Sequence, residues 1–516
     1  MSPSLRHVPI RSMDSSLTQL RYLEEDPDLE PFLGFRPRDV AHLLRRAPIN
    51  ARRLIDPEAL AAAALRYAED HGAPEEALDS ARSLADGVHV IVTGQQPGLF
   101  GGPLYTLHKV ATAVRLAQEI NTASDGPRVL PLFWSHTDDH DLHEVNRAFF
   151  VNSSLEIQRI RLDLERSGES IRDIGVGRDL DHALAAVADL LPHSEYRDWA
   201  LDLFRPRQPD EHFGDGLARM LFSMFGKHGL LVIEPRDLPA ESFDVLPRWW
   251  EQANEIRSSI VSTIEVLLEL GIDISLDPGA TLMFQNTGGR RVAMADGDPI
   301  NRVTDLSPGV LLRPLWQDAC LPTLGTVVGP GELAYLSVAG PLYRKLGVPV
   351  PVFVPRTSLT LVEPSLVKLL KRFNWDLPDL AAGVEQLTKS TVGDESSDGE
   401  SGLDVLIDHI AKEMSELAMA TRTADSQMVR AVERTRSKVN DELTKLRNKL
   451  RNSRQNREGT GARQIRRIVS SLRPRGRPQE RVLTALPFLA AHGATLADDL
   501  VAAADPFTSG HGVLEL

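Results

Sequence analysis

The fold is decided by the stretch Val90-Ile-Val-Thr-Gly-Gln-Gln-Pro-Gly-Leu-Phe-Gly-Gly-Pro-Leu-Tyr-Thr-Leu-His-Lys109. An apolar run over residues 88–92 leads into a segment rich in glycine and proline, and an amphipathic pattern follows over residues 104–120. This order predicts a strand, a glycine loop and a helix. His108 and Lys109 then lie about one turn into that helix, close to whatever the loop holds.

The glycine loop has the composition of an anion-binding loop. Its glycines have no Cβ, so the backbone can take positive φ angles and approach a ligand closely; they are Gly94, Gly98, Gly101 and Gly102. The first turn of the following helix presents unpaired N–H groups, which favour an anion. The loop and the helix start are therefore candidates for holding a phosphate or a carboxylate.

Length and composition bound the class of protein. A chain of 516 residues with 42% hydrophobic content can bury a sizeable core and divides into more than one domain. We find no apolar run of about 18 residues and no apolar core of a signal peptide, which predicts a cytoplasmic protein without a membrane span. The single cysteine, Cys320, excludes an intrachain disulfide and is typical of a small buried residue in a reducing compartment.

The pattern of apolar runs predicts an α/β fold. Residues 1–85 have helical periodicity, whereas residues 88–92, 129–134, 230–233 and 350–354 are short apolar runs typical of buried parallel strands. Helical segments lie between them, which favours an open, doubly wound, Rossmann-like sheet. We expect these divisions: an N-terminal helical segment at 1–85, core halves at 86–151 and 306–385, insertions at 152–305, a coiled-coil hairpin at 386–475 and a returning segment at 476–516.

The region after residue 385 predicts the coiled coil. An acidic stretch over residues 393–402 is interpreted as a mobile loop. Apolar positions then recur at helical spacing from 403 to 450, with a change of phase near 428–432, and predict one long helix. Gly459-Thr-Gly461 would turn the chain, so that residues 462–472 run back as the antiparallel partner.

Charge is distributed unevenly along the chain. The net charge is −14, but residues 428–482 contain 17 Lys and Arg against 5 Asp and Glu. This basic arm leaves open an RNA-binding or scaffold protein, whose affinity for RNA would fall steeply with salt. The arm has no aromatic residue to stack on bases, so pairing with an acidic partner surface is the simpler interpretation.

A second polar cluster follows the strand predicted at 129–134. It comprises His136, Asp138, Asp139, His140, Asp141, His143 and Glu144. The carboxyl ends of strands are where open α/β sheets bind ligands, and neighbouring titratable groups shift one another's pKa values, as acid–base sites require. Two alternatives stay open: a metal site, since two pairs are four residues apart, or a solvated helix start with Asp caps.

A third cluster is divided among three neighbouring segments. Arg313, Gln317 and Asp318 precede an apolar run that ends at Gly329-Pro-Gly331, and Glu332 and Tyr335 fall on the first turn of the next predicted helix. Glu332 could receive an amine or only complement the helix dipole. Arg356 and Ser358 follow the predicted strand at 350–354, where they can meet a carboxylate or phosphate. We expect the three clusters to converge along one edge of the sheet.

Four segments together resemble the bacillithiol biosynthesis cysteine-adding enzyme family. They are residues 93–109, residues 133–146, Val328-Gly-Pro-Gly-Glu-Leu-Ala-Tyr335 and Pro478-Gln-Glu-Arg481. The resemblance implies a core related to class I nucleotidyltransferases and aminoacyl-tRNA synthetases, with connecting-peptide insertions and a coiled coil that supports a homodimer. It also implies a ligase that joins the carboxyl of cysteine to the amine of glucosaminyl malate, with ATP or ADP as cofactor.

The resemblance also suggests roles for single residues. His108 matches the last His of the synthetases' nucleotide-binding motif, while the first His and a Lys-Met-Ser-Lys-Ser-like loop are absent; Arg356-Thr-Ser358 is a loose candidate for the latter. The expected catalytic residues are His108, Lys109, Asp138, Asp139 and His140. The expected binding residues are Thr93, Gly94, Gln95, Gln96, Gly98, Gly102, Pro103, Tyr105, Trp134, Asp141, Glu144, Asn146, Arg313, Gln317, Asp318, Gly329, Gly331, Glu332, Tyr335, Arg356 and Ser358.

In this interpretation the glycine loop holds an anion, and His108 and Lys109 stabilise developing charge. The acidic cluster holds the amine and acts as general base, while Glu332 and Tyr335 orient a substrate. No metal is expected. The enzymatic alternative is a nucleotidyltransferase that adenylates another small carboxylic acid.

Overall fold

The computed structural model describes residues 4–49, 54–123, 127–164, 168–272, 274, 276–277, 279–392, 398–421, 426–455 and 460–516. The chain forms two compact units. The main unit comprises Met1–Asn152, Ile157–Pro364 and Arg477–Leu516, and the coiled-coil unit comprises Ser153–Glu156 and Ser365–Gly476. The coiled-coil unit thus begins at Ser365, whereas the sequence pattern places the boundary at residue 386.

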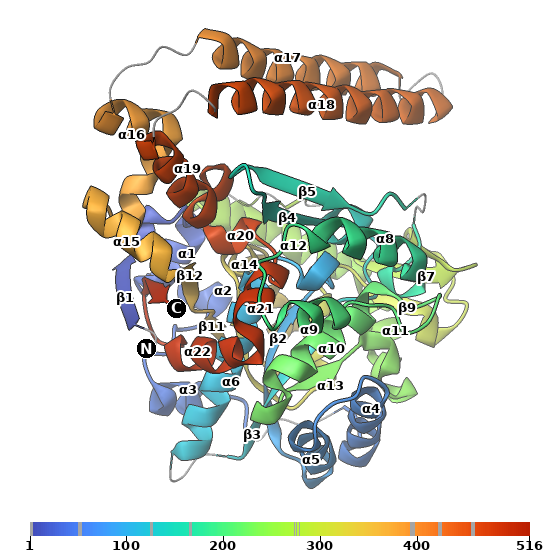
Figure 1. Ribbon diagram of the computed structural model, residues 1–516. Coiled ribbons are helices and arrows are strands. Elements are labelled where there is room, and N and C mark those ends of the chain that lie inside the picture. The colour runs from blue at the N-terminus through green and yellow to red at the C-terminus, as the bar shows by residue number, and fades with distance from the viewer. Residues whose placement is uncertain are drawn as a thin grey trace. The chain divides into compact units, whose positions relative to one another are not determined.

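A five-stranded parallel sheet forms the centre of the main unit (Figure 1). Its strands are β2 (His89–Gln95), β3 (Val129–Ser135), β6 (Leu231–Ile233), β10 (Thr323–Val328) and β11 (Val352–Pro355). They pair in the order β11-β10-β2-β3-β6, and every pairing is parallel. This is a Rossmann-like, doubly wound α/β sheet, as the apolar runs predict.

Alternate strand residues face opposite sides of this sheet, because successive side chains in a strand point to opposite faces. On β3, Leu132 and Trp134 pack into one apolar cluster and Phe133 packs into another. The first of these clusters also receives α12 (Ala253–Glu269), α13 (Arg313–Cys320) and α14 (Pro330–Leu346). The second receives α6 (Tyr105–Thr122), α10 (Phe213–Phe225) and α22 (Leu496–Ala503). Helices therefore cover both faces.

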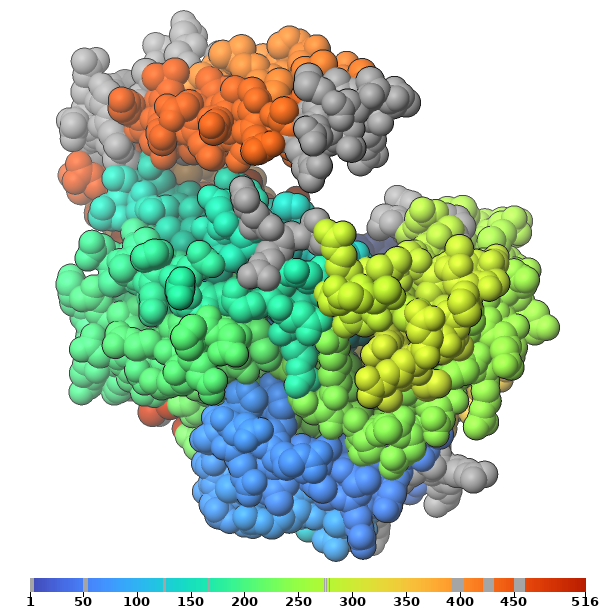
Figure 2. All heavy atoms as spheres, turned by 90° about the vertical axis from the view of Figure 1, so that its right-hand side faces the viewer, coloured from blue at the N-terminus to red at the C-terminus, as the bar shows by residue number. Residues whose placement is uncertain are grey.

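Three smaller sheets surround the core. β1 (Ser4–Pro9) pairs with β13 (Gly510–Glu515), which also pairs with β12 (Ser358–Val362), so the two ends of the chain meet in one sheet. β4 (Arg147–Val151) and β5 (Ile157–Arg161) form a hairpin. β7 (Met283–Thr287), β8 (Arg290–Ala293) and β9 (Leu306–Pro308) form the third sheet, whose segment is lime-yellow on the face shown in Figure 2.

The remaining helices of the main unit are short. They are α1 (Leu17–Leu23), α2 (Glu30–Leu33), α3 (Val40–Arg46), α4 (Pro57–Asp70), α5 (Glu75–Ser83), α7 (Leu142–Val145), α8 (Gly177–Ala188), α9 (Arg197–Asp202), α11 (Val245–Glu251), α20 (Gln479–Val482) and α21 (Leu486–His492). The segment at 1–85 is thus mainly helical, as predicted, although it also contributes β1. Among the described residues, no helix is long and apolar enough to span a membrane.

The sequence pattern does not identify β10 as a strand, although β10 lies between β11 and β2. Its apolar run is interrupted by Gly325, which weakens the strand signal. A Cβ at that position would lie 3.3 Å from both Ile91 Cδ1 and the Val352 carbonyl oxygen, so the neighbouring strands leave little room for a larger residue.

The coiled-coil unit differs from its prediction in two respects. It contains α15 (Pro364–Phe373, which starts at the last residue of the main unit), α16 (Gly383–Val392), α17 (Asp398–Thr421), α18 (Ser426–Gln455) and α19 (Thr460–Leu472). The single long helix predicted over 403–450 is wrong, because α17 and α18 are separate helices that pack side by side as the hairpin (Figure 1). Residues 462–472 belong to α19, which packs against α16 and is not the antiparallel partner helix of the coiled coil.

The physical reason lies in the sequence between the two hairpin helices. Residues 421–426 read Thr-Arg-Thr-Ala-Asp-Ser, and Thr, Asp and Ser side chains compete for backbone hydrogen bonds and favour helix ends. The change of apolar phase near 428–432 falls slightly later, within the first turns of α18. Of the loop expected at 393–402, residues 393–397 lie outside the described residues, and residues 398–402 belong to α17. Of the turn expected at 459–461, residue 459 lies outside the described residues, and residues 460–461 begin α19.

Candidate active site

A large cavity lies where the strand order of the sheet reverses. β2 and β10 are neighbours, but α6 after β2 and α14 after β10 pack into apolar clusters on opposite faces. Such a switch point opens a crevice at the carboxyl ends of the two strands, where doubly wound sheets bind ligands. The cavity here has a volume of about 1060 Å³ and is lined by the ends of both strands. That volume is large enough for a ligand of nucleotide or disaccharide size.

The glycine loop after β2 is shaped mainly by packing against its own chain. A Cβ on Gly98 would lie 2.7 Å from Gly102 Cα, and Gly101, with φ +85°, would place one 2.6 Å from Met220 Sδ. Thr484 donates to the carbonyl of Phe100 and further fixes the loop. Gly98, Gly102 and Pro103 therefore do not reach the cavity, whereas Gly94, Gln95 and Gln96 line it.

Lys109 is the buried cation between the two strand ends. Its Nζ donates to the carbonyl of Gly94 at 2.6 Å and to Gln95 Oε1 at 3.2 Å, and lies 2.6 Å from Glu332 Oε2. Burial lowers the pKa of Lys109, and the charge of Glu332 opposes that shift. Glu332 also accepts from the N–H of Gly329 and so caps α14. One ion pair thus joins the loop after β2 to the loop after β10.

A second buried cluster is centred on Glu480. Arg356 donates to both carboxylate oxygens of Glu480 at 2.7 Å, and Ser358 Oγ and His108 Nδ1 lie 2.5 and 2.8 Å from them. Burial lowers the pKa of His108, although the charge of Glu480 opposes this, so the ring is neutral at neutral pH. Arg356 lines the cavity, with its guanidinium 5.7 Å from the centre of the Tyr105 ring. Because a bidentate ion pair is geometrically specific, Glu480 fixes the direction of Arg356.

Asp139 has cationic and amide partners on several sides. Its Oδ2 accepts from Arg313 and from Gln96 Nε2, both at 3.0 Å, and its Oδ1 lies 3.4 Å from Arg291. Burial alone would raise the pKa of Asp139, but the charges of Arg313 and Arg291 and a hydrogen bond from His140 hold it far below the usual value. Such a carboxylate is a weak base. The geometry therefore favours a positioning role for Asp139 over the expected role as general base.

Glu144 is the acidic side chain near the mouth of the cavity whose environment suits proton transfer. Partial burial and the charges of Asp141 and Asp139 raise the pKa of Glu144. It lines the cavity together with Asp141, His140 and His143. His136 also lines the cavity, but burial, together with the charge of Arg313, lowers its pKa to about 3, so it is neutral.

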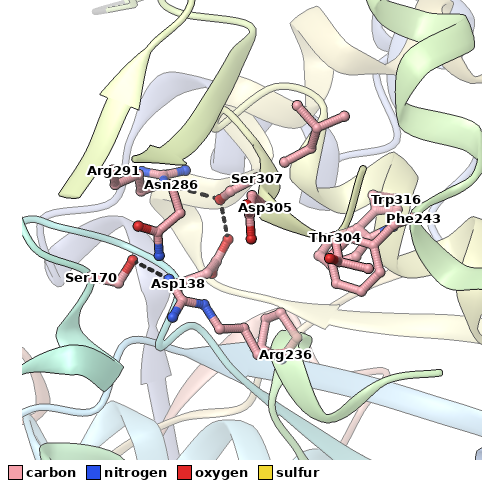
Figure 3. A pocket seen from close by; sticks show the side chains of 12 residues that line it. Asp138, Ser170, Arg236, Phe243, Asn286, Arg291, Thr304, Asp305, Ser307 and Trp316 are labelled. Carbon is pink, nitrogen blue, oxygen red and sulfur yellow. Dashed lines mark hydrogen bonds between the residues drawn. The ribbon is translucent and has the colours of Figure 1, made fainter. Parts of the chain in front are cut away.

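Asp138 lies in a separate hollow of about 90 Å³ (Figure 3). Ser307 Oγ donates to Asp138 Oδ2 at 2.9 Å and accepts from Arg291 at 3.0 Å. Arg236 donates to Ser170 on the other side of this hollow. Arg291 lines both spaces, whereas Asp138 lines the small hollow and is not among the residues around the main cavity. The expected role of Asp138 at the reacting groups therefore has no geometric support.

Several other expected site residues lie outside the main cavity. Those outside the lining of the main cavity are Thr93, Gly98, Gly102, Pro103, His108, Trp134, Asp138, Asn146 and Ser358. Thr93 donates to the carbonyl of Val327, Asn146 donates to that of Leu162, and Trp134 packs edge-on against Trp316. Their position next to polar motifs made them look functional, but none of them lines the main cavity: most are buried in the protein interior, and Asp138 lines the separate hollow.

The remaining expected residues do come together. The cavity is lined by Gly94, Gln95, Gln96, Tyr105, Lys109, Asp139, His140, Asp141, Glu144, Arg313, Gln317, Asp318, Gly329, Gly331, Glu332, Tyr335 and Arg356. The sequence analysis gave no site role to Arg291 and Phe284, which also line the cavity. They lie on β8 and β7, on either side of a polar turn that matches no motif. The sequence also left open a second nucleotide pocket where Arg473, Arg475, Arg477 and Arg481 meet the core, because guanidinium groups suit phosphates. Two of these four arginines, Arg477 and Arg481, line the present cavity.

The metal interpretation of the second cluster has no support in the geometry. Within the part of the chain that the structure describes, no three His, Cys, Asp or Glu side chains are grouped so that they could hold a metal ion. His136 and His140 both line the cavity, and His140 Nδ1 lies 2.9 Å from Arg291. Cys320 is buried, and its burial holds the pKa of the thiol far above the usual value.

A doubly wound sheet with a large crevice of mixed charge at its switch point defines a Rossmann-like α/β protein, and such a crevice is where proteins of this class bind small polar ligands. Comparison with known families identifies which one. Residues 5–304 and 300–357 match the bacillithiol biosynthesis BshC N-terminal Rossmann-like domain, and residues 359–516 match the BshC C-terminal coiled-coil domain. The chain therefore belongs to the bacillithiol biosynthesis BshC family.

Individual relatives agree with the family match over most of the chain. The relative from Koribacter versatilis is 30% identical over 84% of this chain and 85% of its own, and that from Heliobacterium modesticaldum is 31% identical over 85% and 86%. The relative from Salinibacter ruber is 27% identical over 94% of both chains. All three carry the name "Putative cysteine ligase BshC".

Proposed function

We propose that this protein is a cytoplasmic ligase that joins the carboxyl of cysteine to the amine of glucosaminyl malate and forms an amide. The names of the relatives support cysteine as the substrate. The observation that carries the proposal is the division of charge around one cavity. Lys109, Arg356, Arg477 and Arg481 are cationic, whereas Asp141 and Glu144 are acidic; Asp139 also lines the cavity but is already paired with Arg313. A dicarboxylate that also bears an amine needs both kinds of partner.

The cationic side suits the carboxylates. Burial lowers the pKa of Arg481, and the nearby like charge of Arg356 lowers it further. Two guanidinium groups facing one cavity repel each other, so an anion between them is stabilised by both. Arg481 and Arg356 would hold a malate carboxylate or a phosphate, with Glu480 holding Arg356 in place.

Formation of the amide breaks the C–O bond of the cysteine carboxyl and forms a C–N bond, with loss of one proton from the amine. Hydroxide is a poor leaving group, so the carboxyl must first be activated as an acyl phosphate or an acyl adenylate. Its oxygen then leaves as phosphate or as a nucleoside monophosphate, and ATP would supply that group when bound. The cationic residues named above fit a polyphosphate. Lys109 would stabilise negative charge on the carbonyl oxygen as the tetrahedral centre forms. Glu144 would take the proton from the amine.

The experiment that tests this function is a mass-spectrometric assay of the purified protein with cysteine, glucosaminyl malate and ATP. We expect the cysteinyl amide of glucosaminyl malate to accumulate. Absence of this amide would exclude the proposed ligase activity. Equal turnover of an unrelated carboxylic acid in place of cysteine would support the nucleotidyltransferase alternative.

Replacing Glu144 by Gln should lower turnover by ~10²-fold or more and remove the acid limb of the pH–rate profile. A base must be deprotonated to act, and the raised pKa of Glu144 brings that limb towards neutral pH. The control is Glu265→Gln on the exposed face of α12, which should leave the profile unchanged. An E144Q profile that keeps the wild-type acid limb would exclude Glu144 as the base.

The coiled-coil hairpin supports a homodimer as the assembled form. Val405 and Met419 of α17 are 67% and 70% exposed, which is costly for apolar side chains that remain in water. Light scattering coupled to size exclusion should report a dimer for the wild type and a monomer for the V405E/M419E variant. A monomeric wild type would remove this proposal and leave the proposed activity intact.

A further inference from the structure

The main cavity continues inwards from the charged groups to a buried end. Its inner end is formed by Asp318 of α13, Thr326 of β10, Leu336 and Tyr343 of α14, and Phe353 of β11. All of these side chains except that of Thr326 are buried, whereas Glu144, Gly331 and Arg477 at the mouth are exposed. The wall is thus apolar around a single carboxyl group.

The Asp318 carboxyl differs from the other buried carboxyl groups of the site. Tyr343 Oη donates to its Oδ2 at 2.6 Å, and Gln317 Nε2 donates to its Oδ1 at 3.2 Å. Both donors are neutral. Among the described residues, no Lys, Arg or His forms an ion pair with Asp318, whereas Glu480 and Asp139 each have an arginine partner. Burial raises the pKa of Asp318 to about 6, so the group is still mostly ionised at neutral pH.

An ionised carboxylate buried without a counter-ion is expensive, because desolvation disfavours its charge. A cation supplied by a ligand would provide the missing partner. A second polar group at the inner end also lacks a partner: Thr326 Oγ1 is buried and has no hydrogen bond. The hydroxyl of Thr326 can accept from an ammonium group that Asp318 also binds.

Resting on the proposed function, we propose that the inner end is the amino-acid subsite, in which Asp318 binds the α-ammonium group of the cysteine that is to be ligated. That ammonium group takes no part in the reaction, so it can remain bound throughout. The apolar wall of Leu336 and Phe353 accommodates a small uncharged side chain and disfavours a second charge.

The direction of α13 places the carboxyl of such a ligand towards the reacting groups. Arg313, Pro314, Gln317 and Asp318 all line the cavity from one face of this helix, and Arg313 lies nearer the charged cluster around Asp139. Five residues of α-helix span about 7.5 Å. An amino acid held by its ammonium group at Asp318 therefore points its carboxyl along α13 towards the mouth.

The test compares cysteine with 3-mercaptopropionate, which is cysteine without its α-amino group, by isothermal titration calorimetry. Wild-type protein should bind cysteine at least ~10-fold more tightly, which is the usual contribution of a charge-assisted hydrogen bond. In D318N, cysteine should bind about as weakly as 3-mercaptopropionate, whose own affinity should not change. D163N, at an exposed aspartate outside the cavity, is the matched control.

The possible results separate this inference from the proposed function. A D318N protein that still prefers cysteine by the wild-type factor, or that loses both ligands equally, overturns the subsite and leaves the ligase proposal standing. A wild type that binds no cysteine and forms no amide overturns both. Should D318N not fold, the isosteric T326V variant replaces it, and we expect that variant to lose affinity for cysteine alone; unchanged preference in T326V would then overturn the subsite.

Discussion

Replacement of Lys109 by Met is expected to lower kcat/KM for amide formation by ~10³-fold. Lys109 is the cation that lies buried between the carboxyl ends of β2 and β10, within 2.6 Å of Glu332. An ammonium group in such a place, with little water around it, acts strongly on negative charge that develops on a reacting carbonyl. Steady-state kinetics of the purified variant measure the loss.

The loss could also come from the unpaired Glu332 that Lys109→Met leaves behind. The double variant K109M/E332Q separates the two causes, because it removes both charges of the pair. If Lys109 acts on the transition state, the double variant stays ~10³-fold slow; recovery to near wild-type rates would mean that the lysine only neutralises Glu332. Lys227→Met, which breaks a surface ion pair with Asp498, should change the rate little.

Replacement of Glu480 by Gln is expected to destabilise the protein at neutral pH by about 3–5 kcal/mol, the usual cost of removing one partner of a buried ion pair. The variant leaves Arg356 buried without a counter-charge, and the single amide oxygen cannot replace both carboxylate oxygens that Arg356, His108 and Ser358 contact. Urea denaturation measures the free energy of unfolding. The control E265Q should remain within about 0.5 kcal/mol of the wild type.

The same variant should change how stability depends on pH. Burial alone would raise the pKa of Glu480, but the charge of Arg356 and the hydrogen bond with His108 hold it well below the usual value. A carboxyl with a lowered pKa stabilises the fold above its unfolded pKa of about 4.3, and this contribution is lost as the pH falls from there through the folded pKa. The difference between wild type and E480Q should therefore be largest near pH 7 and shrink below about pH 4. Equal stability at pH 7 would contradict the importance of this cluster.

The sequence predicted the fold where local patterns are strong. Residues 88–109 combine an apolar run, a glycine loop and a helical period, and each signal agrees with the structure that follows. β10 was missed because Gly325 is required by close packing of neighbouring strands, which is a property of the sheet and not of the segment. The division between α17 and α18 left two weak signals, a short polar run at 421–426 and a change of apolar phase just after it. One continuous helix with a stutter also explains the second.

The site was predictable to the extent that it depends on strand ends. Lys109, Asp139, Glu332 and Arg356 belong to different motifs and line one cavity, because parallel strands end at the same edge. The sequence could not distinguish side chains that face the cavity from those behind it: His108 is next to Lys109 but points to Glu480. That difference of about 100° around a helix depends on the exact start of α6.

The most direct test of the account is a crystal structure of this protein with its proposed product, bacillithiol, bound. The central claim is that the crevice between β2 and β10 is where cysteine and glucosaminyl malate are joined. We predict the new amide bond within the cavity near Lys109 and Glu144, with the malate carboxylates facing Arg356 and Arg481. Product bound outside this crevice, with these four side chains free of it, would contradict the account.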